Sequence, residues 1–234
     1  MQSIIKIIDL KYTYPDGRKA LNGINLHIAK GEKVALVGAN GAGKSTLLLH
    51  LNGVLQGEGR IEIDGLQIDK KNLSSIRAKV GLIFQDPDDQ LFSPTVFDDV
   101  AFGLIYQGIN KEEIPENVRK ALDDVGMDGY EERNPYHLSG GEKKRIAIAT
   151  VLVMNPSILV IDEPSTGLDP RSRRELIDLI NGLPQTLLIA SHDLDLISRT
   201  TQRMIVMNHG EIVADGSTDQ LMKDTDLLLA NGLL

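Results

Sequence analysis

The chain has 234 residues, of which 41% are hydrophobic and 25% are charged, as in a globular protein built around one sizeable α/β domain. It contains no cysteine, which excludes disulfide bonds and thiolate chemistry. The formal net charge of −8 argues against a large basic face, so we expect no nucleic acid among its partners and no direct docking on anionic lipid.

Short apolar runs alternate along the chain with longer helical patterns. Residues 24–28 alternate apolar and polar side chains, which indicates a half-buried strand, and residues 60–64 predict another antiparallel element. Four further runs are apolar without interruption, as in parallel strands that are covered on both faces. These runs are residues 34–37, 80–84, 158–161 and 186–190. The pattern predicts an α/β fold with a mostly parallel sheet and an antiparallel N-terminal β subdomain.

Helices are predicted over residues 45–51 and after Asp169, an N-cap residue that Pro170 follows. Three further helical pieces lie near residues 94–106, 111–125 and 140–154. We expect a single domain, residues 1–234, with a helical subdomain inserted at residues 86–155. The core is then formed by residues 1–85 and 156–234.

The sequence GANGAGKS, residues 38–45, follows an apolar run and opens a helix, which is the context of a P-loop. Its glycines let backbone N–H groups point at phosphate oxygens, with Lys44 reaching the β- and γ-phosphates and Ser45 ligating Mg²⁺. The alternative is a glycine-rich turn without a ligand. The predicted nucleotide contacts in this segment are Gly38, Asn40, Gly41, Gly43, Lys44, Ser45 and Thr46.

Asp162 and Glu163 directly follow the apolar run 158–161. Ligands of open α/β sheets bind beyond the carboxyl ends of the strands, so both carboxylates are expected at a ligand site. There Asp162 would hold Mg²⁺, and Glu163 would orient and polarise an attacking water. The alternative is a pair of acids in a solvated loop. The P-loop upstream favours the catalytic interpretation.

Residues 138–145, LSGGEKKR, lie between these two motifs. Ser139 and Glu142 have the spacing of a capping box, which is a purely structural interpretation. A cap does not need the adjacent Gly140 and Gly141, each of which has an entropic cost. Bare backbone at a helix N-terminus is suited to binding an anion.

This segment resembles the LSGGQ-type signature of the ABC ATPases, with Glu142 in place of the more common glutamine. The resemblance covers essentially the whole chain and implies a P-loop NTPase (RecA-like) core that binds ATP and Mg²⁺ and hydrolyses ATP. In that family the signature, here Ser139, Gly140, Gly141 and Glu142, binds the γ-phosphate held by the P-loop of another subunit. The resemblance therefore implies a second ATPase chain, either an identical copy or a paralogue.

Other family motifs follow in the expected order. Gln85 resembles the Q-loop glutamine, which contacts Mg²⁺, and His192 resembles the H-loop histidine, which contacts the γ-phosphate. Residues 165–169 resemble the D-loop, and Tyr14 resembles the aromatic residue that stacks on adenine, with Tyr12 as a competing choice. The implied catalytic residues are Lys44, Glu163 and His192, and the implied Mg²⁺ ligands are Ser45, Gln85 and Asp162.

Residues 84–103, FQDPDDQLFSPTVFDDVAFG, resemble the branch of ABC ATPases that serves cobalt importers and energy-coupling-factor transporters for cobalt, nickel or vitamins. Those systems join two ATPase chains with a transmembrane coupling protein and a substrate-binding membrane protein. The resemblance implies that Asp86, Asp88 and Asp89 meet short helices of the membrane partner; the alternative is a solvated acidic loop. The longest nearly continuous apolar stretch, residues 146–154, is about half the ~20 residues of a membrane helix, so partners would hold the chain at the cytoplasmic face.

Two other functions compete with transport. A soluble ABC ATPase of DNA repair or translation usually carries coiled-coil insertions, tandem ATPase domains or basic surfaces, none of which the sequence displays. A P-loop kinase for a small molecule does not account for the glycine pair after Ser139 or for the pair Asp162-Glu163. The sequence favours a transport-coupled ATPase.

Overall fold

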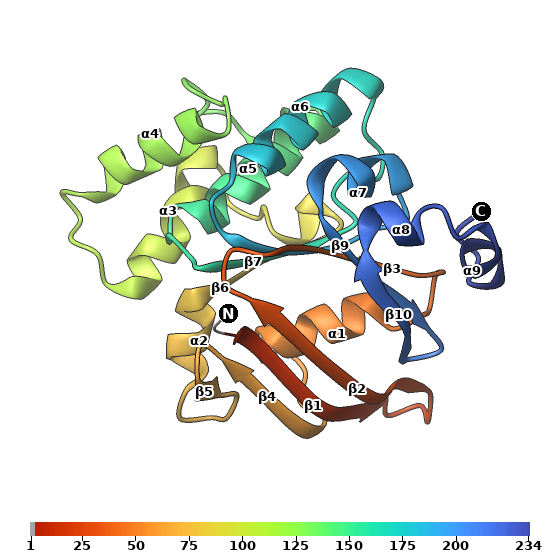
Figure 1. Ribbon diagram of the computed structural model, residues 1–234. Helices are drawn as coiled ribbons and strands as arrows, with labels where there is room; N and C mark the ends of the chain where they lie inside the picture. The colour runs from red at the N-terminus through yellow and green to blue at the C-terminus, as the bar shows by residue number, and fades with distance from the viewer. Residues whose placement is uncertain (1–2) are drawn as a thin grey trace. The chain divides into compact units, whose positions relative to one another are not determined.

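The computed structural model describes residues 3–234, which form two compact units (Figure 1). The core unit comprises the described residues up to Leu82 together with Ser157–Glu163 and Pro184–Leu234. The helical unit comprises Ile83–Pro156 and Pro164–Leu183.

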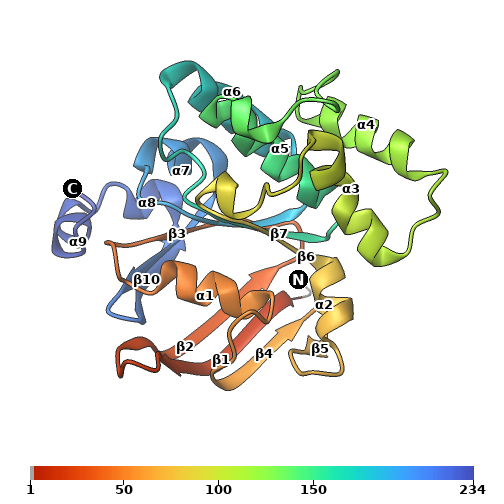
Figure 2. The same ribbon diagram turned by 180° about the vertical axis from the view of Figure 1, so that it is seen from behind.

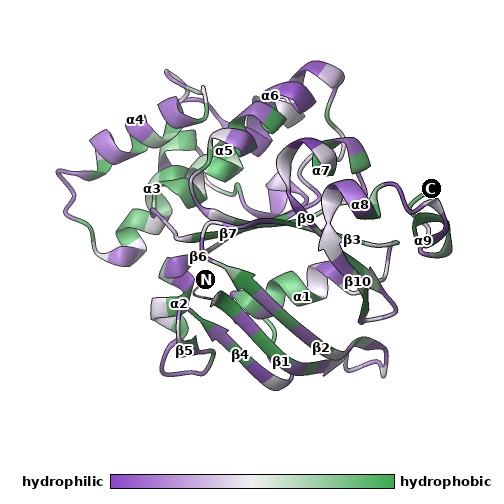
Figure 3. Cartoon of the chain, viewed as in Figure 1, coloured by the Kyte–Doolittle hydropathy of each residue, from purple (hydrophilic) through white to green (hydrophobic). Residues whose placement is uncertain are grey.

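One sheet of the core unit is antiparallel, in the order β2-β1-β4-β5. Its strands are β1 (Ser3–Thr13), β2 (Lys19–Ala29), β4 (Glu58–Ile63) and β5 (Leu66–Gln67). Figure 3 shows hydrophobic and hydrophilic residues alternating along β1 and β2, which matches a sheet with one buried face. The strands predicted at residues 24–28 and 60–64 are confirmed.

The second sheet has six strands in the order β10-β9-β3-β8-β7-β6. Its strands are β3 (Lys33–Val37), β6 (Val80–Ile83), β7 (Ile158–Asp162), β8 (Thr186–Ala190), β9 (Arg203–Asn208) and β10 (Glu211–Ser217). β3 is parallel to β8 and β9, β7 is parallel to β8, and β10 is antiparallel to β9. All four continuous apolar runs form strands here and are buried, apart from Phe84, which lies beyond the end of β6.

Helix α1 (Lys44–Leu51) lies between the two sheets of the core unit (Figures 1 and 2). Leu47 and Leu48 of this helix share one core cluster with Ile28 of the antiparallel sheet and Leu188 of the parallel sheet. Packing on two sides fixes the start of α1, and with it the loop that precedes the helix. The core unit also contains α2 (Leu73–Lys79), α7 (Leu194–Thr200), α8 (Thr218–Leu221) and α9 (Thr225–Ala230).

The helical unit contains α3 (Val96–Gln107), α4 (Ile114–Asp124), α5 (Gly140–Leu152) and α6 (Pro170–Gly182), with the 3₁₀ helices η1 (Pro87–Asp89) and η2 (Pro135–His137). Helix α3 begins two residues after Pro94 because the Thr95 hydroxyl caps it by accepting the N–H of Asp98 at 3.1 Å. The caps predicted at Ser139 and Asp169 are confirmed. Within residues 3–234, no helix combines the length and apolarity needed to cross a membrane.

The segment that carries α6 was expected in the core, but residues 164–183 belong to the helical unit. The physical reason is the packing of α6 on α5. Arg145 of α5 forms an ion pair with Glu175 of α6 at 3.4 Å, and Gly141 lies against Ser172 with no room for a side chain between them. The helical unit therefore combines the expected insertion with a helix from further along the chain.

Candidate functional site

Two glycines shape the loop between β3 and α1. Gly43 precedes α1 with a φ of 105°, and a Cβ there would lie 2.5 Å from the carbonyl oxygen of Ala20. A Cβ on Gly38 would lie 2.3 Å from the carbonyl oxygen of Met207. Larger residues are excluded at both positions, so the backbone can curl as a P-loop requires.

Lys44 is a buried cation beside this loop. Its side chain is only 6% exposed, and Nζ donates to the carbonyl oxygens of Gly38 at 2.7 Å and Ala39 at 3.4 Å. Glu163 Oε1, on a side chain that is 7% exposed, lies 3.6 Å from Nζ. Each buried charge stabilises the other, since an isolated one would be strongly disfavoured.

Asp162, the last residue of β7, faces Ser45 in the first turn of α1. Burial raises the pKa of Asp162, although the Ser45 hydroxyl donates a hydrogen bond to its carboxylate and Lys44 also favours the ionised form. Its Oδ1 is buried and has no hydrogen-bond partner within the described chain. An orphaned carboxylate oxygen beside a hydroxyl is a donor set that suits a hard cation such as Mg²⁺.

Glu163 has a left-handed backbone, with a φ of 42°, which is uncommon for a residue with a side chain. Its N–H donates to the carbonyl oxygen of Ala190 at 2.8 Å, just beyond the last pair of the β7–β8 ladder. The strained turn therefore fixes where the carboxylate emerges from the sheet. Such conformations cluster at functional sites.

Three groups converge on Glu163 Oε2. His192 Nδ1 lies 2.8 Å away, while the Ser191 hydroxyl and the His192 backbone N–H donate at 3.2 Å and 3.3 Å. The His192 side chain is 62% exposed, whereas Ser191 is fully buried. His192 can therefore meet a ligand while it orients the buried carboxylate.

Tyr14 and Tyr12 have different surroundings. The Tyr14 hydroxyl lies 3.0 Å from Thr46 Oγ1, in the first turn of α1, and its ring is covered by Arg18 at 4.7 Å. Tyr12 packs edge-on against Tyr14 at 5.0 Å and against the buried His50 at 4.8 Å. The hydroxyl contact with Thr46 ties Tyr14 to the helix that the P-loop opens.

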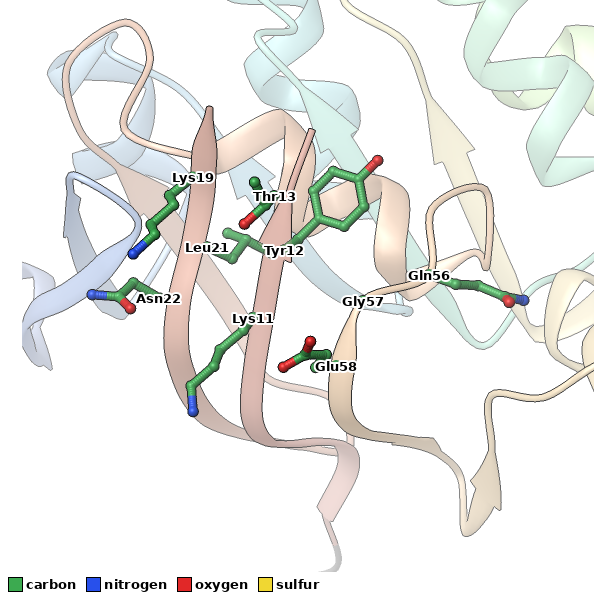
Figure 4. Close-up of a pocket in the computed structure, with 9 residues that line it drawn as sticks. All are labelled: Lys11, Tyr12, Thr13, Lys19, Leu21, Asn22, Gln56, Gly57 and Glu58. Carbon is green, nitrogen blue, oxygen red and sulfur yellow. The ribbon is translucent and has the colours of Figure 1, made fainter. Parts of the chain in front are cut away.

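A surface pocket of about 500 Å³ lies beside Tyr12. Figure 4 shows that it is lined from both strands of the β1–β2 hairpin and from the segment that leads into β4. None of residues 38–46 lines it, so this pocket is not the phosphate-binding cradle.

In the helical unit, Ser139 and Glu142 form the predicted capping box at the start of α5. Glu142 Oε2 accepts the backbone N–H of Ser139 at 2.8 Å and its hydroxyl at 2.7 Å, and Tyr130 donates its hydroxyl to Oε1 at 2.7 Å. These bonds, that of Tyr130 first, lower the pKa of Glu142, which keeps it an anion at neutral pH. Gly140 has open space around its Cα, so its bare backbone is accessible.

Gln85 and the acidic residues after it are bound to α5. Lys144 Nζ donates to the carbonyl oxygen of Gln85 at 3.3 Å, and Lys143 forms an ion pair with Asp88 at 2.6 Å. The side chain of Gln90 donates to two further groups of α5 at 2.7 Å. The acidic segment is therefore anchored to α5 at both ends.

The core unit brings together most of the predicted site, namely Tyr14, residues 38–46, Asp162, Glu163 and His192, whereas Gln85 and residues 139–142 belong to the helical unit. Ser191 and Tyr130, which bind the carboxylates of Glu163 and Glu142, were not predicted. Ser191 could have been found from its position directly after a predicted strand. Tyr130 gave no signal, because it lies in an irregular segment before the signature and contacts Glu142 only through the fold.

Comparison with known proteins identifies the family of the chain. A family model described as ABC transporter matches residues 21–166. The energy-coupling factor transporter ATP-binding protein EcfA of Methanothermobacter thermautotrophicus is 51% identical in an alignment of 231 positions, which covers 96% of this chain and 74% of that relative.

Two solved structures are similar over nearly the full length. CbiO1 of Clostridium perfringens, described as part of the ABC transporter complex CbiONQ, has a TM-score of 0.86 at 38% identity, covering 98% of this chain and 94% of its own. The dimeric ATP-binding cassette MJ0796, in a post-hydrolysis state bound to ADP and Pi, has a TM-score of 0.82 at 28% identity, covering 92% of this chain and 98% of its own.

Proposed function

Because the chain belongs to the ABC transporter family, as an ATP-binding subunit that hydrolyses ATP, we propose that it powers an importer of the energy-coupling-factor type for cobalt, nickel or a vitamin. The likeness to EcfA and to CbiO1 supports this branch. The main support for ATP hydrolysis at this site is that the buried carboxylate of Glu163 contacts both Lys44 and His192.

Glu163 is the residue that orients and polarises the attacking water. Its Oε2 is held by His192 and Ser191, so the carboxylate is already positioned before a ligand arrives. Lys44 exchanges its bonds to the loop carbonyls for phosphate oxygens, and His192 contacts the γ-phosphate from its exposed side. Gly38–Ser45 hold the remaining phosphate oxygens through backbone N–H groups.

Ser45 and Asp162 are the residues of the core unit that fit Mg²⁺, because Asp162 Oδ1 is an orphaned buried oxygen next to the Ser45 hydroxyl. Within residues 3–234, no group of three or more His, Cys, Asp or Glu side chains could hold a metal alone, so phosphate oxygens and water are needed as further ligands. Gln85 is the third protein ligand that we propose. Mg²⁺ would neutralise charge on the phosphates during hydrolysis.

A second ATPase chain, identical or paralogous, completes the site. Ser139, Gly140 and Gly141 offer a hydroxyl and bare backbone at the N-terminus of α5, which suits the γ-phosphate bound by the other protomer. The dimeric state of the related cassette MJ0796 supports this arrangement. One chain alone would then lack part of the machinery for hydrolysis.

The helical unit offers a surface for the membrane partners. Phe92, Phe102, Ile105 and Tyr106 are between 55% and 70% exposed, and the rings of Phe92 and Phe102 lie 5.3 Å apart. Exposed apolar groups of this size mark interaction surfaces. We assign this patch, together with Asp86, Asp88 and Asp89, to a transmembrane coupling protein that acts with a substrate-binding membrane protein and holds the chain at the cytoplasmic face.

The test is purification of the tagged chain with its complex from source membranes, followed by identification of the co-purified proteins by mass spectrometry. Reconstituted vesicles should then take up labelled cobalt, nickel or vitamin only with ATP, and a complex carrying Glu163→Gln should not. A chain that instead purifies with ribosomes or DNA, without membrane proteins, would overturn the transport assignment.

A further inference from the structure

The carboxylate of Glu142 binds more donors than a capping box needs. The box requires only the Ser139 backbone N–H, which Glu142 Oε2 accepts at 2.8 Å. The same oxygen also accepts the Ser139 hydroxyl at 2.7 Å, and Oε1 accepts the Tyr130 hydroxyl at 2.7 Å. Charge-assisted bonds of this length are among the stronger hydrogen bonds in proteins.

The Ser139 hydroxyl has a single proton, and that proton is directed at Glu142. The hydroxyl oxygen lies 3.4 Å from the Glu142 N–H, so its bond as an acceptor is long, whereas its bond as a donor is short. A phosphate oxygen that takes the Ser139 proton must therefore compete with an anionic carboxylate. A glutamine at position 142 would offer a neutral amide oxygen, which is a weaker competitor.

We propose that Tyr130 is a positioning residue of the signature, whose hydroxyl sets how firmly Glu142 holds the Ser139 proton and thus how readily Ser139 turns to the γ-phosphate. The reasoning is electrostatic. A donor on Oε1 draws negative charge towards that oxygen, which weakens Oε2 as an acceptor for Ser139. This inference rests on the proposed function, because it takes the signature as the group that meets the nucleotide of another protomer.

The charged groups around the network keep both partners in the required state. The guanidinium of Arg133 covers the Tyr130 ring at 3.8 Å and adds to the lowering of the Glu142 pKa. Glu142 raises the pKa of Tyr130, while Arg133 and Arg145 oppose that shift. Tyr130 therefore stays a protonated donor, and Glu142 an ionised acceptor, across the neutral range.

Tyr130→Phe removes the donor on Oε1 and keeps the ring under Arg133. Without the Tyr130 hydroxyl, Glu142 Oε2 should hold the Ser139 proton more firmly, and the KM for ATP in steady-state hydrolysis is expected to rise about five-fold, the effect of about one hydrogen bond. ATP binding to the isolated chain should stay unchanged. In a Glu142→Gln background, Tyr130→Phe should leave KM unchanged, because the carboxylate on which Tyr130 acts is absent.

Tyr136→Phe is the matched control, since Tyr136 is 64% exposed and lies in the same unit. It should leave KM as in the unsubstituted chain. If Tyr130→Phe lowers activity equally in both backgrounds, or leaves KM unchanged, Tyr130 has a structural role only and the inference is overturned. Ser139→Ala tests the proposed function separately from the role of Tyr130. If Ser139→Ala leaves hydrolysis at full rate, the signature does not act on the nucleotide and the proposed function fails at that point.

Discussion

Glu163 and His192 are joined twice, because the ring Nδ1 and the backbone N–H of His192 both reach the same carboxylate oxygen, at 2.8 Å and 3.3 Å. The backbone bond holds Glu163 even when the ring turns away. The ring is thus free to contact a ligand without releasing the carboxylate.

Glu163→Gln is expected to slow ATP hydrolysis by roughly 100- to 10,000-fold, since an amide cannot act as a general base. ATP binding should persist, because Lys44 and the glycine loop are unchanged, so closed dimers should accumulate with ATP. Phosphate release and size-exclusion chromatography measure the two effects. Glu116→Gln, in an exposed ion pair, is the control and should hydrolyse ATP normally. Normal hydrolysis by Glu163→Gln would show that another group is the base.

Asp162→Asn is expected to stabilise the nucleotide-free chain at neutral pH. Burial raises the folded pKa of Asp162 above its unfolded value of about 3.9, so the native state is destabilised progressively as the pH rises from the unfolded pKa to the folded one. At lower pH both states are protonated, and the advantage of the variant should disappear. Thermal unfolding in EDTA between about pH 4 and pH 8 measures this difference.

The same Asp162 variant should lose the additional thermal stabilisation that Mg²⁺ gives in the presence of ATP. A variant that is less stable than the unsubstituted chain at every pH would contradict the burial argument. A variant that retains the full Mg²⁺ effect would remove Asp162 from the proposed ligands.

Gly141→Ala is expected to destabilise the chain by about 1–3 kcal/mol, because its Cβ would lie 2.6 Å from Ser172 Oγ and 2.8 Å from Ser172 Cβ. Gly140→Ala is the matched control, since its Cβ would meet nothing within 4 Å. Adding Ser172→Gly to Gly141→Ala should recover part of the lost stability. Chemical denaturation measures all three variants, and equal effects at positions 140 and 141 would refute the close contact.

Arg203→Ala is expected to destabilise the core unit by about 1–3 kcal/mol. The guanidinium binds Asp215 through two nitrogens at 2.7 Å, and it also binds Glu32 and the carbonyl oxygen of His27. It therefore joins β9 to β10 and to the end of β2. Arg119→Ala removes an exposed pair and should stay within about 0.5 kcal/mol of the unsubstituted chain. If both variants lose a similar amount of unfolding free energy, the partly buried ion pairs of Arg203 stabilise the chain no more than an exposed pair does.

The parallel strands and the site residues of the core unit could be predicted because their signals are local. A strand buried on both faces needs continuous apolar side chains, and the glycine loop and the pair Asp162-Glu163 each occupy a few consecutive positions. The side-chain partners of these residues were not predictable. Ser191 and Tyr130 reach their carboxylates only through the folded chain, and the place of α6 depends on its contact with Gly141.

The position of β3 in its sheet has a consequence for biosynthesis. Its Val34 pairs with Leu188 of β8 and with Arg203 of β9, so the strand that leads into the P-loop has neighbours that lie far along the sequence. On the ribosome this strand emerges early, and its backbone groups stay unpaired until β8 and β9 have also been made. The strand that leads into the P-loop therefore cannot complete its sheet until both of these later strands have been made, and until then its unpaired edges are open to pairing with other chains.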